Sequence, residues 1–183
     1  MVQNGTLNMK KGFEMRKKLL FSLISVLFFM GCQEGGQIPS NGGAALANEV
    51  TVLKSVVAKD LKNLGAWIKL GNIYMDTGKN EEAIDAYSHA LELDPANVDV
   101  RTDRATCYRY TGKPEKAVEE YKTALTINPN HANAMKNLGV VLEYDLKRKK
   151  EAKQVFEELL KRHPDDPDSR KIKAEIERLG WAR

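Results

Sequence analysis

Three histidines and an acidic run are the residues in this sequence whose types could bind a metal ion. His89, His131 and His163 lie far apart, near the ends of successive predicted helices, so a shared metal site is not expected. The acidic run at 165–168 lacks the later glycine and bidentate glutamate of a calcium loop. Carboxylates at a helix N-terminus interact favourably with the helix dipole, which explains this run better. We therefore expect no metal ion and no other cofactor.

The motifs of the common enzyme classes are absent from the sequence, including G-x-x-x-x-G-K-[ST], H-E-x-x-H, G-x-S-x-G and C-x-x-C. The 183 residues carry a formal net charge of +4, but residues 1–31 hold five of the basic residues and one acid. The remainder is neutral and lacks the surplus of Lys and Arg on which nucleic-acid binding depends. We expect a protein that is neither an enzyme nor a nucleic-acid binder.

Residues 15–31 have the layout of an export signal. Met15 is followed by three basic residues, by the apolar run 19–30 and by the small residue Gly31. Twelve apolar residues extend about 18 Å as a helix, which is too short for a hydrocarbon core of about 30 Å. We therefore predict a signal peptide over residues 1–31, with Met15 as the true start, rather than a permanent membrane span.

The end of this signal, Phe29-Met30-Gly31-Cys32, resembles the lipobox of bacterial lipoproteins, with Phe29 at the position usually held by Leu. The resemblance implies that cleavage and lipidation make Cys32 the lipid-anchored N-terminus of the mature protein. Because Gln33 rather than Asp follows the cysteine, the resemblance also implies the outer membrane, with the protein facing the periplasm. An ordinary cleaved signal is the alternative.

The segment after the signal is predicted to be a flexible tether. Residues 33–48 contain four glycines, one proline and almost no charge, which predicts a reach of roughly 20 to 24 Å. The lipidated N-terminus and tether together span residues 32–48. Cys107 is then the one remaining thiol, so no internal disulfide can form. It lies at an apolar position of a predicted helix, where we expect a small buried side chain.

Beyond residue 48 the sequence repeats itself, with successive repeats starting at positions 64, 98 and 132. Each repeat has two facing stripes of residues at helical spacing, mostly apolar, with a proline after them, and repeats 1 and 2 also have a glycine between the two helices. The matching residues are Trp67, Leu70, Gly71, Tyr74, Gly78, Ala83, Tyr87, Ala90 and Pro95 in repeat 1 (64–97); Arg101, Arg104, Ala105, Tyr108, Gly112, Ala117, Tyr121, Ala124 and Pro129 in repeat 2 (98–131); and Met135, Leu138, Gly139, Leu142, Ala152, Phe156, Leu159 and Pro164 in repeat 3 (132–166).

This pattern resembles the tetratricopeptide repeat W-x2-L-G-x2-Y…A-x3-F…P in order and register. The resemblance implies an all-α fold, a right-handed superhelical stack of antiparallel helix pairs. Residues 49–63 resemble the second helix of a repeat whose first helix is missing, and residues 167–183 are predicted to form a capping helix and tail. Three repeats, a half-repeat and a cap suffice for a stable stack.

Two departures from the repeat pattern stand out. Arg101 and Arg104 replace large apolar residues, so we expect their aliphatic stems to cover the neighbouring helix while their charged ends reach water. Repeat 3 has a one-residue insertion beside the cationic run 147–150. A solvated helix start explains this run, and contact with anionic lipid headgroups is the alternative.

The predicted binding surface, called the groove face here, is the side of the first helix of each repeat that points away from the packing stripe. It mixes polar and apolar residues, which suits an extended peptide or a helix from a partner protein. Its predicted residues are Ile68, Asn72, Met75, Asp99, Thr102, Thr106, Arg109, Asn133, Lys136, Val140 and Glu143.

Some relatives with this repeat clamp a C-terminal carboxylate on the groove face. Asn72, Lys136 and Asn137 match the residue types of that clamp, but Ile68 and Asp103 do not, so the activity is not carried over. We expect a lipid-anchored scaffold that binds a protein or peptide partner in the cell envelope. Two specialisations are alternatives. One resembles the lipoproteins that pilot secretin assembly for type IV pili, and the other resembles the repeat modules that present apocytochromes during c-type haem attachment.

Overall fold

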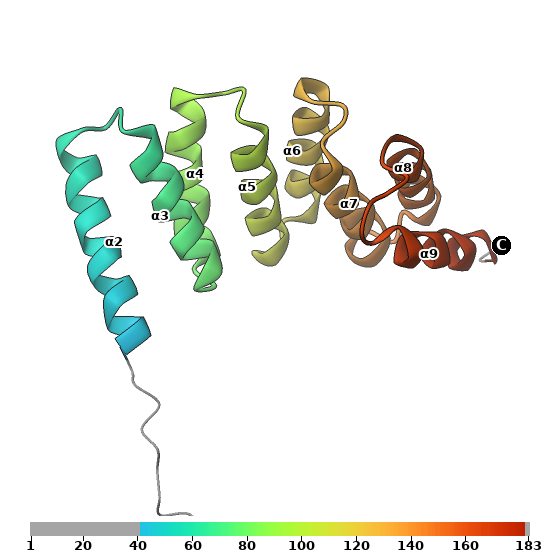
Figure 1. Cartoon of the computed structure of the whole chain (residues 1–183), viewed down its shortest axis with the longest axis horizontal. Coiled ribbons are helices and arrows are strands. Elements are labelled where there is room, and N and C mark those ends of the chain that lie inside the picture. The colour runs from blue at the N-terminus through green and yellow to red at the C-terminus, as the bar shows by residue number, and fades with distance from the viewer. Residues whose placement is uncertain (1–40, 182–183) are drawn as a thin grey trace, which may run out of the picture. The chain divides into compact units, whose positions relative to one another are not determined.

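The computed structural model describes residues 41–181 of the chain, shown in colour in Figure 1. The predicted signal peptide and Cys32 lie outside the described residues. The described residues from 43 onward belong to one compact unit, and the description below concerns this unit. None of the helices described is both long and apolar enough to cross a membrane.

The described residues form eight α-helices and one π-helical segment, and residues 41–181 contain no β-strand. The elements are α2 (Asn41–Lys59), α3 (Leu64–Asp76), α4 (Asn80–Leu93), α5 (Val98–Tyr110), α6 (Pro114–Ile127), α7 (Ala132–Val140), η1 (Val141–Asp145), α8 (Lys149–Arg162) and α9 (Ser169–Trp181). Helices α3, α5 and α7 begin at the first residues of the three predicted repeats, and each pairs with the helix that follows it. The predicted all-α stack of antiparallel helix pairs is confirmed.

Equivalent residues cap and separate the helices in each repeat. Asn63 and Asn97 accept hydrogen bonds through Oδ1 from the backbone N–H three residues on, at 3.0 and 3.1 Å, and the Nδ1 of His131 does the same at 3.1 Å. Gly78 and Gly112 adopt φ of 73° and 72° between the paired helices, a left-handed conformation that glycine adopts without a steric penalty. These residues set where each first helix starts and ends.

The paired helices approach closely because small residues face aromatic ones. A Cβ atom on Gly71 would overlap the ring of Tyr87, and one on Gly139 would overlap the ring of Phe156. Repeat 2 has Ala105 and Tyr121 at the equivalent positions, and both are buried. The close contact therefore requires a small residue on the first helix wherever an aromatic ring lies opposite it on the second.

Repeat 3 accommodates its inserted residue in the first helix. The helix widens from α to π hydrogen bonding at η1, which takes up one extra residue without breaking the chain of backbone hydrogen bonds. Lys147, with φ of 58°, then takes the left-handed turn position that glycine holds in repeats 1 and 2. Leu142 and Ala152 consequently stay buried in the helix packing.

Helix α2 starts earlier than the sequence analysis predicts. It begins at Asn41, so residues 41–48, predicted to belong to the flexible tether, are helical instead. The run Ala44-Ala45-Leu46-Ala47 has high intrinsic helix propensity, which outweighs the two glycines before it. The start of the predicted half-repeat at residue 49 is therefore wrong by eight residues.

The buried apolar residues form two clusters that meet at α5. One cluster joins α2, α3, α4 and part of α5, and the other joins the rest of α5 to α6, α7, α8 and α9. Val100 and Cys107 of α5 belong to the first cluster, and Ala105 belongs to the second. The stack is therefore held by two cores that share one helix.

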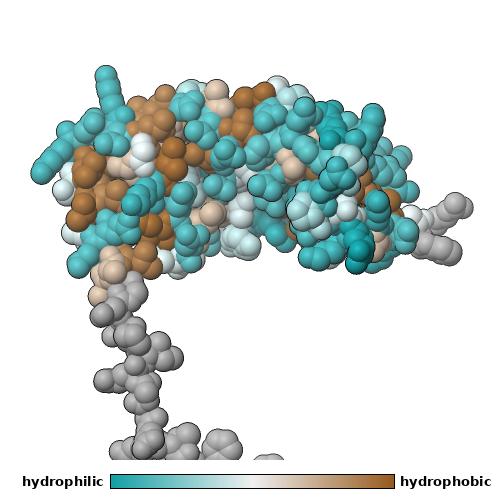
Figure 2. All heavy atoms as spheres, viewed as in Figure 1, coloured by the Kyte–Doolittle hydropathy of each residue, from teal (hydrophilic) through white to brown (hydrophobic). Residues whose placement is uncertain are grey.

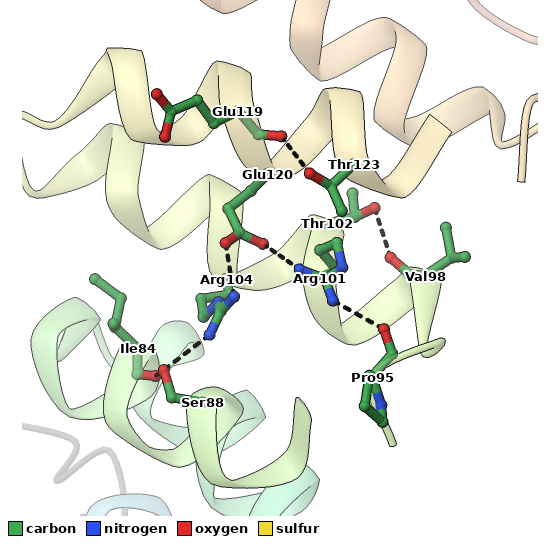
Figure 3. A network of polar contacts seen from close by, with 10 residues as sticks. All are labelled: Ile84, Ser88, Pro95, Val98, Arg101, Thr102, Arg104, Glu119, Glu120 and Thr123. Carbon is green, nitrogen blue, oxygen red and sulfur yellow. Dashed lines mark hydrogen bonds and ion pairs between the residues drawn. The ribbon is translucent and has the colours of Figure 1, made fainter. Parts of the chain in front are cut away.

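A polar network lies where the two clusters meet (Figure 3). Glu120 accepts hydrogen bonds from Arg101 Nη1 at 3.0 Å and from Arg104 Nη2 at 2.6 Å. Arg104 also donates to Ser88 Oγ at 3.0 Å, and Arg101 donates to the carbonyl of Pro95 at 2.8 Å. The arginine side chains are only 14% exposed, so the expectation that their charged ends reach water is wrong. Glu120 takes the place of water as their partner.

Candidate functional site

The structure divides the predicted groove-face residues by exposure. Three are exposed: Asn72, Asp99 and Asn133. Six are half-buried: Ile68, Met75, Thr106, Arg109, Lys136 and Val140. Thr102 and Glu143 are buried, with exposed fractions of 3% and 2%. The first two groups can offer side-chain atoms to a partner, and the last two cannot.

The prediction that Thr102 and Glu143 lie exposed on the groove face is wrong, because both side chains are buried. Thr102 turns its hydroxyl back onto its own helix, where Oγ1 donates to the carbonyl of Val98 at 2.8 Å. Glu143 forms an ion pair with Arg178 of the final helix α9. Because α9 packs against the end of the stack, it covers a carboxylate that the repeat spacing alone places on the surface.

A row of hydrogen bonds links the groove face to the buried tyrosines of the second helices. The hydroxyl of Tyr87 donates to Asn72 Oδ1 at 2.8 Å, and that of Tyr121 lies 2.9 Å from Thr106 Oγ1. Both tyrosines are fully buried, and burial raises the pKa of Tyr121 to about 12, so this hydroxyl stays protonated. The row therefore holds Asn72 and Thr106 in fixed orientations at equivalent positions of repeats 1 and 2.

Repeat 3 replaces this pair with apolar residues. Val140 stands at the position equivalent to Asn72 and Thr106, and Phe156 stands where the tyrosines do. A valine needs no hydrogen-bond partner, and phenylalanine offers none. The polarity of the groove-face residue thus follows that of the ring beneath it, a correlation that the alignment of the repeats contains but that the sequence analysis missed.

Polar contacts run along the groove face from α5 to the start of α7 and to η1. His131 Nε2 lies 2.8 Å from Asp99 Oδ1, and Arg109 Nε donates to Asp145 Oδ2 at 2.6 Å.

Lys136 makes the equivalent contact at the C-terminal end, bridging to Asp168 at 2.8 Å and to Asp166 at 3.3 Å. Burial acts to lower the pKa of Lys136, but hydrogen bonds to the two aspartates raise it above its ordinary value. Arg109 and Lys136, predicted as ligand contacts, therefore also hold neighbouring repeats together.

Asp103 is a further groove-face residue that the sequence analysis noted only as a mismatch. Its pKa is raised to about 6, first by burial and then by the nearby carboxylate of Asp99, while His131 acts in the opposite direction. The equivalent residues of repeats 1 and 3 are Lys69 and Asn137. The middle of the groove face therefore carries negative charge that an acidic ligand would have to overcome.

Two exposed tyrosines at equivalent positions complete the groove face. Tyr110 is 65% exposed at the end of α5, and Tyr144 is 49% exposed in η1. Arg109 lies over the Tyr110 ring at 5.9 Å and Arg178 over the Tyr144 ring at 5.8 Å, which orders both rings. Their equivalence within the repeat was available in the sequence. Exposed aromatic side chains are common anchors at protein interfaces.

Among the described residues, the groove face offers hydrogen bonds, charges and aromatic rings for noncovalent binding, and neither a metal site nor a reactive thiol accompanies them. Within residues 41–181 no group of three His, Cys, Asp or Glu side chains is placed to hold a metal ion. Cys107 is fully buried, and burial followed by the charge of Asp103 raises the pKa of its thiol to about 12. Such a thiol is not a nucleophile at neutral pH.

Comparison with known proteins places the chain in a family. A family model described as the cytochrome c-type biogenesis protein H TPR domain matches residues 46–172. A crystal structure of a tetratricopeptide repeat protein from Parabacteroides merdae is similar, with 27% identity, a TM-score of 0.67, and coverage of 76% of this chain and 55% of that one.

Two further proteins are similar to parts of this chain. The first TPR of Spaghetti (RPAP3), solved with an HSP90 peptide SRMEEVD, has 27% identity and a TM-score of 0.59, and 67% of this chain covers 94% of that one. The peroxisomal targeting signal receptor of Komagataella phaffii is 36% identical over 56 residues, which are 31% of this chain and 10% of the receptor's length. Because the family model spans most of the chain, this protein belongs to the tetratricopeptide-repeat family of cytochrome c-type biogenesis protein H TPR domains.

Proposed function

We propose that this protein is a lipid-anchored scaffold of the bacterial cell envelope that binds a segment of a partner protein on its groove face. The observation that carries the proposal is the row of oriented polar groups at Asn72 and Thr106, together with the exposed rings of Tyr110 and Tyr144 on the first helices of repeats 2 and 3. Fixed hydrogen-bonding groups beside exposed aromatic rings suit peptide recognition, because little conformational entropy is lost on binding.

Similar structures support a peptide as the ligand. The RPAP3 domains were solved with the acidic peptides SRMEEVD, from HSP90, and SGPTIEEVD, from HSP70. Here Asp103 and Asp99 occupy the middle of the groove face, so the partner segment of this protein is neutral or basic at that point rather than acidic. The fold is shared with those domains, and the ligand charge is not.

Lipid anchoring rests on the sequence of residues 15–32, and Gln33 after the cysteine favours the outer membrane, with the scaffold on its periplasmic side. We expect Cys32→Ser to move the protein from the membrane fraction to the soluble periplasmic fraction, with its helix content and thermal midpoint unchanged. Cys107→Ser is the matched control, because Cys107 is buried and cannot be acylated. Membrane retention of the Cys32→Ser protein would contradict the anchor.

Partner binding on the groove face is tested by substituting exposed residues that form no ion pair between repeats. We expect Asn72→Ala combined with Asn133→Ala to lower partner binding in native membranes at least tenfold. Thr123→Ala combined with Glu119→Ala on α6 should leave binding unchanged, since both control residues are exposed on a second helix. Equal binding by both double variants would contradict the assignment of the groove face.

A role in c-type cytochrome biogenesis is the second candidate function, and the family match over residues 46–172 favours it. It makes a different prediction for a deletion strain. Covalently bound haem in periplasmic c-type cytochromes should fall, and it should recover with the wild-type chain but not with the Asn72→Ala/Asn133→Ala variant. Normal levels of covalent haem in the deletion strain would remove this candidate and leave the general scaffold function.

A further inference from the structure

An apolar slot lies between α2, α3 and α4, on a different side of α3 from the groove face. Its volume is about 400 Å³, within the range of ligand pockets in proteins. Trp67, Leu70 and Tyr74 of α3 form its floor, and Val57 and Leu61 line the wall on the α2 side. Figure 2 shows hydrophobic surface gathered over the α2–α4 end of the stack, while the α7–α9 end is mostly hydrophilic.

The aromatic floor of the slot is held in place. The ring of Trp67 stacks on that of His89 from α4, with 4.3 Å between centroids and 27° between planes. Trp67 Nε1 also donates to the carbonyl of Leu61 at 3.0 Å. A ring fixed at both its face and its polar edge offers a flat apolar surface without needing to reorganise on binding.

The equivalent slot of the next repeat is filled. Arg101 and Arg104 stand at the repeat positions of Trp67 and Leu70, and Glu120 stands at that of Ala86. In repeat 2 these three long polar side chains occupy the space between α4 and α6, and Glu120 pairs with both arginines. The first slot is open because apolar residues and an alanine take their places.

The rim of the open slot carries charges that lack partners. Glu82 and Asp85 of α4 are exposed, and neither forms an ion pair with any other residue in the range 41–181. Lys54 of α2 stands on the opposite wall, with Nζ 5.9 Å from the centroid of the Tyr74 ring. The α4 rim therefore favours a cation, and the α2 rim disfavours one.

We propose that this slot is a second protein-docking site, which takes an aromatic side chain and a neighbouring Lys or Arg from a helix of a partner protein. The aromatic ring stacks against Trp67 and Tyr74, and the basic group pairs with Glu82 and Asp85. The assignment does not depend on the groove face or on lipid anchoring. It gives the scaffold two faces that can hold two proteins at once.

Two small probes of similar size and opposite charge test the slot on the mature protein, which begins at residue 32 and carries Cys32→Ser. We expect 2-phenylethylammonium to shift the indole N–H resonance of Trp67 in a saturable manner. 3-Phenylpropionate should bind at least fivefold more weakly, because the carboxylates on the α4 rim repel it. The resonance is assigned with Trp67→Phe.

Matched variants locate the binding. Ala58→Phe puts a ring into the slot from an exposed position on its α2 wall and should abolish the shift, whereas Ala174→Phe, at an exposed alanine of α9, should not. Glu82→Gln/Asp85→Asn should weaken 2-phenylethylammonium about fivefold. Glu115→Gln/Glu119→Gln on α6 should have no effect. The proposal is overturned if the Trp67 resonance does not respond, if both probes bind equally, or if Ala58→Phe binds as the wild type does.

Discussion

Repeats 1 and 2 share one backbone arrangement but fill the same space in opposite ways. Behind α3, the apolar residues Trp67 and Leu70 leave an open slot. Behind α5, Arg101 and Arg104 close the equivalent space around Glu120. The comparison shows that the repeat fold tolerates either solution, because the close contact between paired helices is made elsewhere, at Gly71 with Tyr87 in repeat 1, and repeat 2 has the buried residues Ala105 and Tyr121 at the equivalent positions.

The difference has a consequence for how the stack is held together. An apolar packing stripe joins α3 to both of its neighbours in one cluster, whereas the polar network on α5 lies where the two clusters meet. A buried ion network needs all its members, because a charge left without its partner is costly. We therefore expect repeat 2 to be more sensitive than repeat 1 to loss of a single polar residue.

Glu120→Ala should have the largest effect. It leaves Arg101 and Arg104 with little exposure and without their shared carboxylate, at a cost of about 3 kcal/mol in the free energy of unfolding. Urea denaturation followed by circular dichroism measures the change. Glu119→Ala, at the exposed neighbouring residue, should stay within about 0.5 kcal/mol of the wild type. A similarly small change for Glu120→Ala would show that the network contributes nothing to stability.

Gly71→Ala should have the next largest effect, because it tests the contact that the repeats share. The added methyl overlaps the Tyr87 ring, and we expect a net loss of about 2 kcal/mol despite the better helix propensity of alanine. Ala105→Gly, at the same position of repeat 2, removes a methyl without a clash and should cost about 1 kcal/mol. If Gly71→Ala is as stable as the wild type, the ring can move and the close contact is not a constraint.

The triple change Arg101→Trp/Arg104→Leu/Glu120→Ala gives repeat 2 the residues of repeat 1. We expect a stability within about 1.5 kcal/mol of the wild type, because removing all three charged side chains also removes the desolvation cost of the buried ion network, even though the apolar residues leave a slot open. This result, set beside the large effect of Glu120→Ala alone, would establish that the two solutions are interchangeable. A triple variant less stable than Glu120→Ala would show instead that repeat 2 requires its network.

Asp103→Asn should have the smallest effect, and it should be stabilising. The pKa of Asp103 in the folded protein is about 6, above the unfolded value of about 4, so the folded state binds this proton more tightly. Stability therefore falls as pH rises from about 4 to about 6, and the penalty is complete above that range. We expect Asp103→Asn to gain about 1 kcal/mol at pH 7.5, after allowance for solvent screening, and nothing at pH 4. An equal gain in stability at both pH values would show that ionisation of Asp103 is not the cause.

The regular part of the fold could be predicted from the sequence because it depends on spacing. Residues at equivalent repeat positions, such as Gly78 and Gly112, have the same role in successive repeats, and the structure bears this out. The start of α2 was missed because two glycines suggested a flexible chain, while the alanines after them favour helix. The helix propensity of the alanines sets the start of α2, since the repeat pattern does not extend to residues 41–48.

The candidate site could be predicted only in outline. Spacing identified the side of the helix that carries Asn72 and Thr106, but it could not show that α9 covers Glu143 or that Lys136 pairs with Asp166 and Asp168. Those contacts join segments outside the repeat period. The open slot also could not be predicted from spacing. It lies between three helices, and it is open because repeat 1 lacks the long polar side chains that fill the equivalent space in repeat 2.

Site-specific photo-crosslinking in native membranes tests most directly whether the groove face binds a protein partner. A photoreactive phenylalanine is placed at Asn72 or Asn133 on the groove face, and at Thr123 on the exposed side of α6 as the control. The account predicts one discrete adduct, of the same mass, from both groove-face positions and none from position 123. An adduct formed only from position 123, or none from either groove-face position, would contradict it.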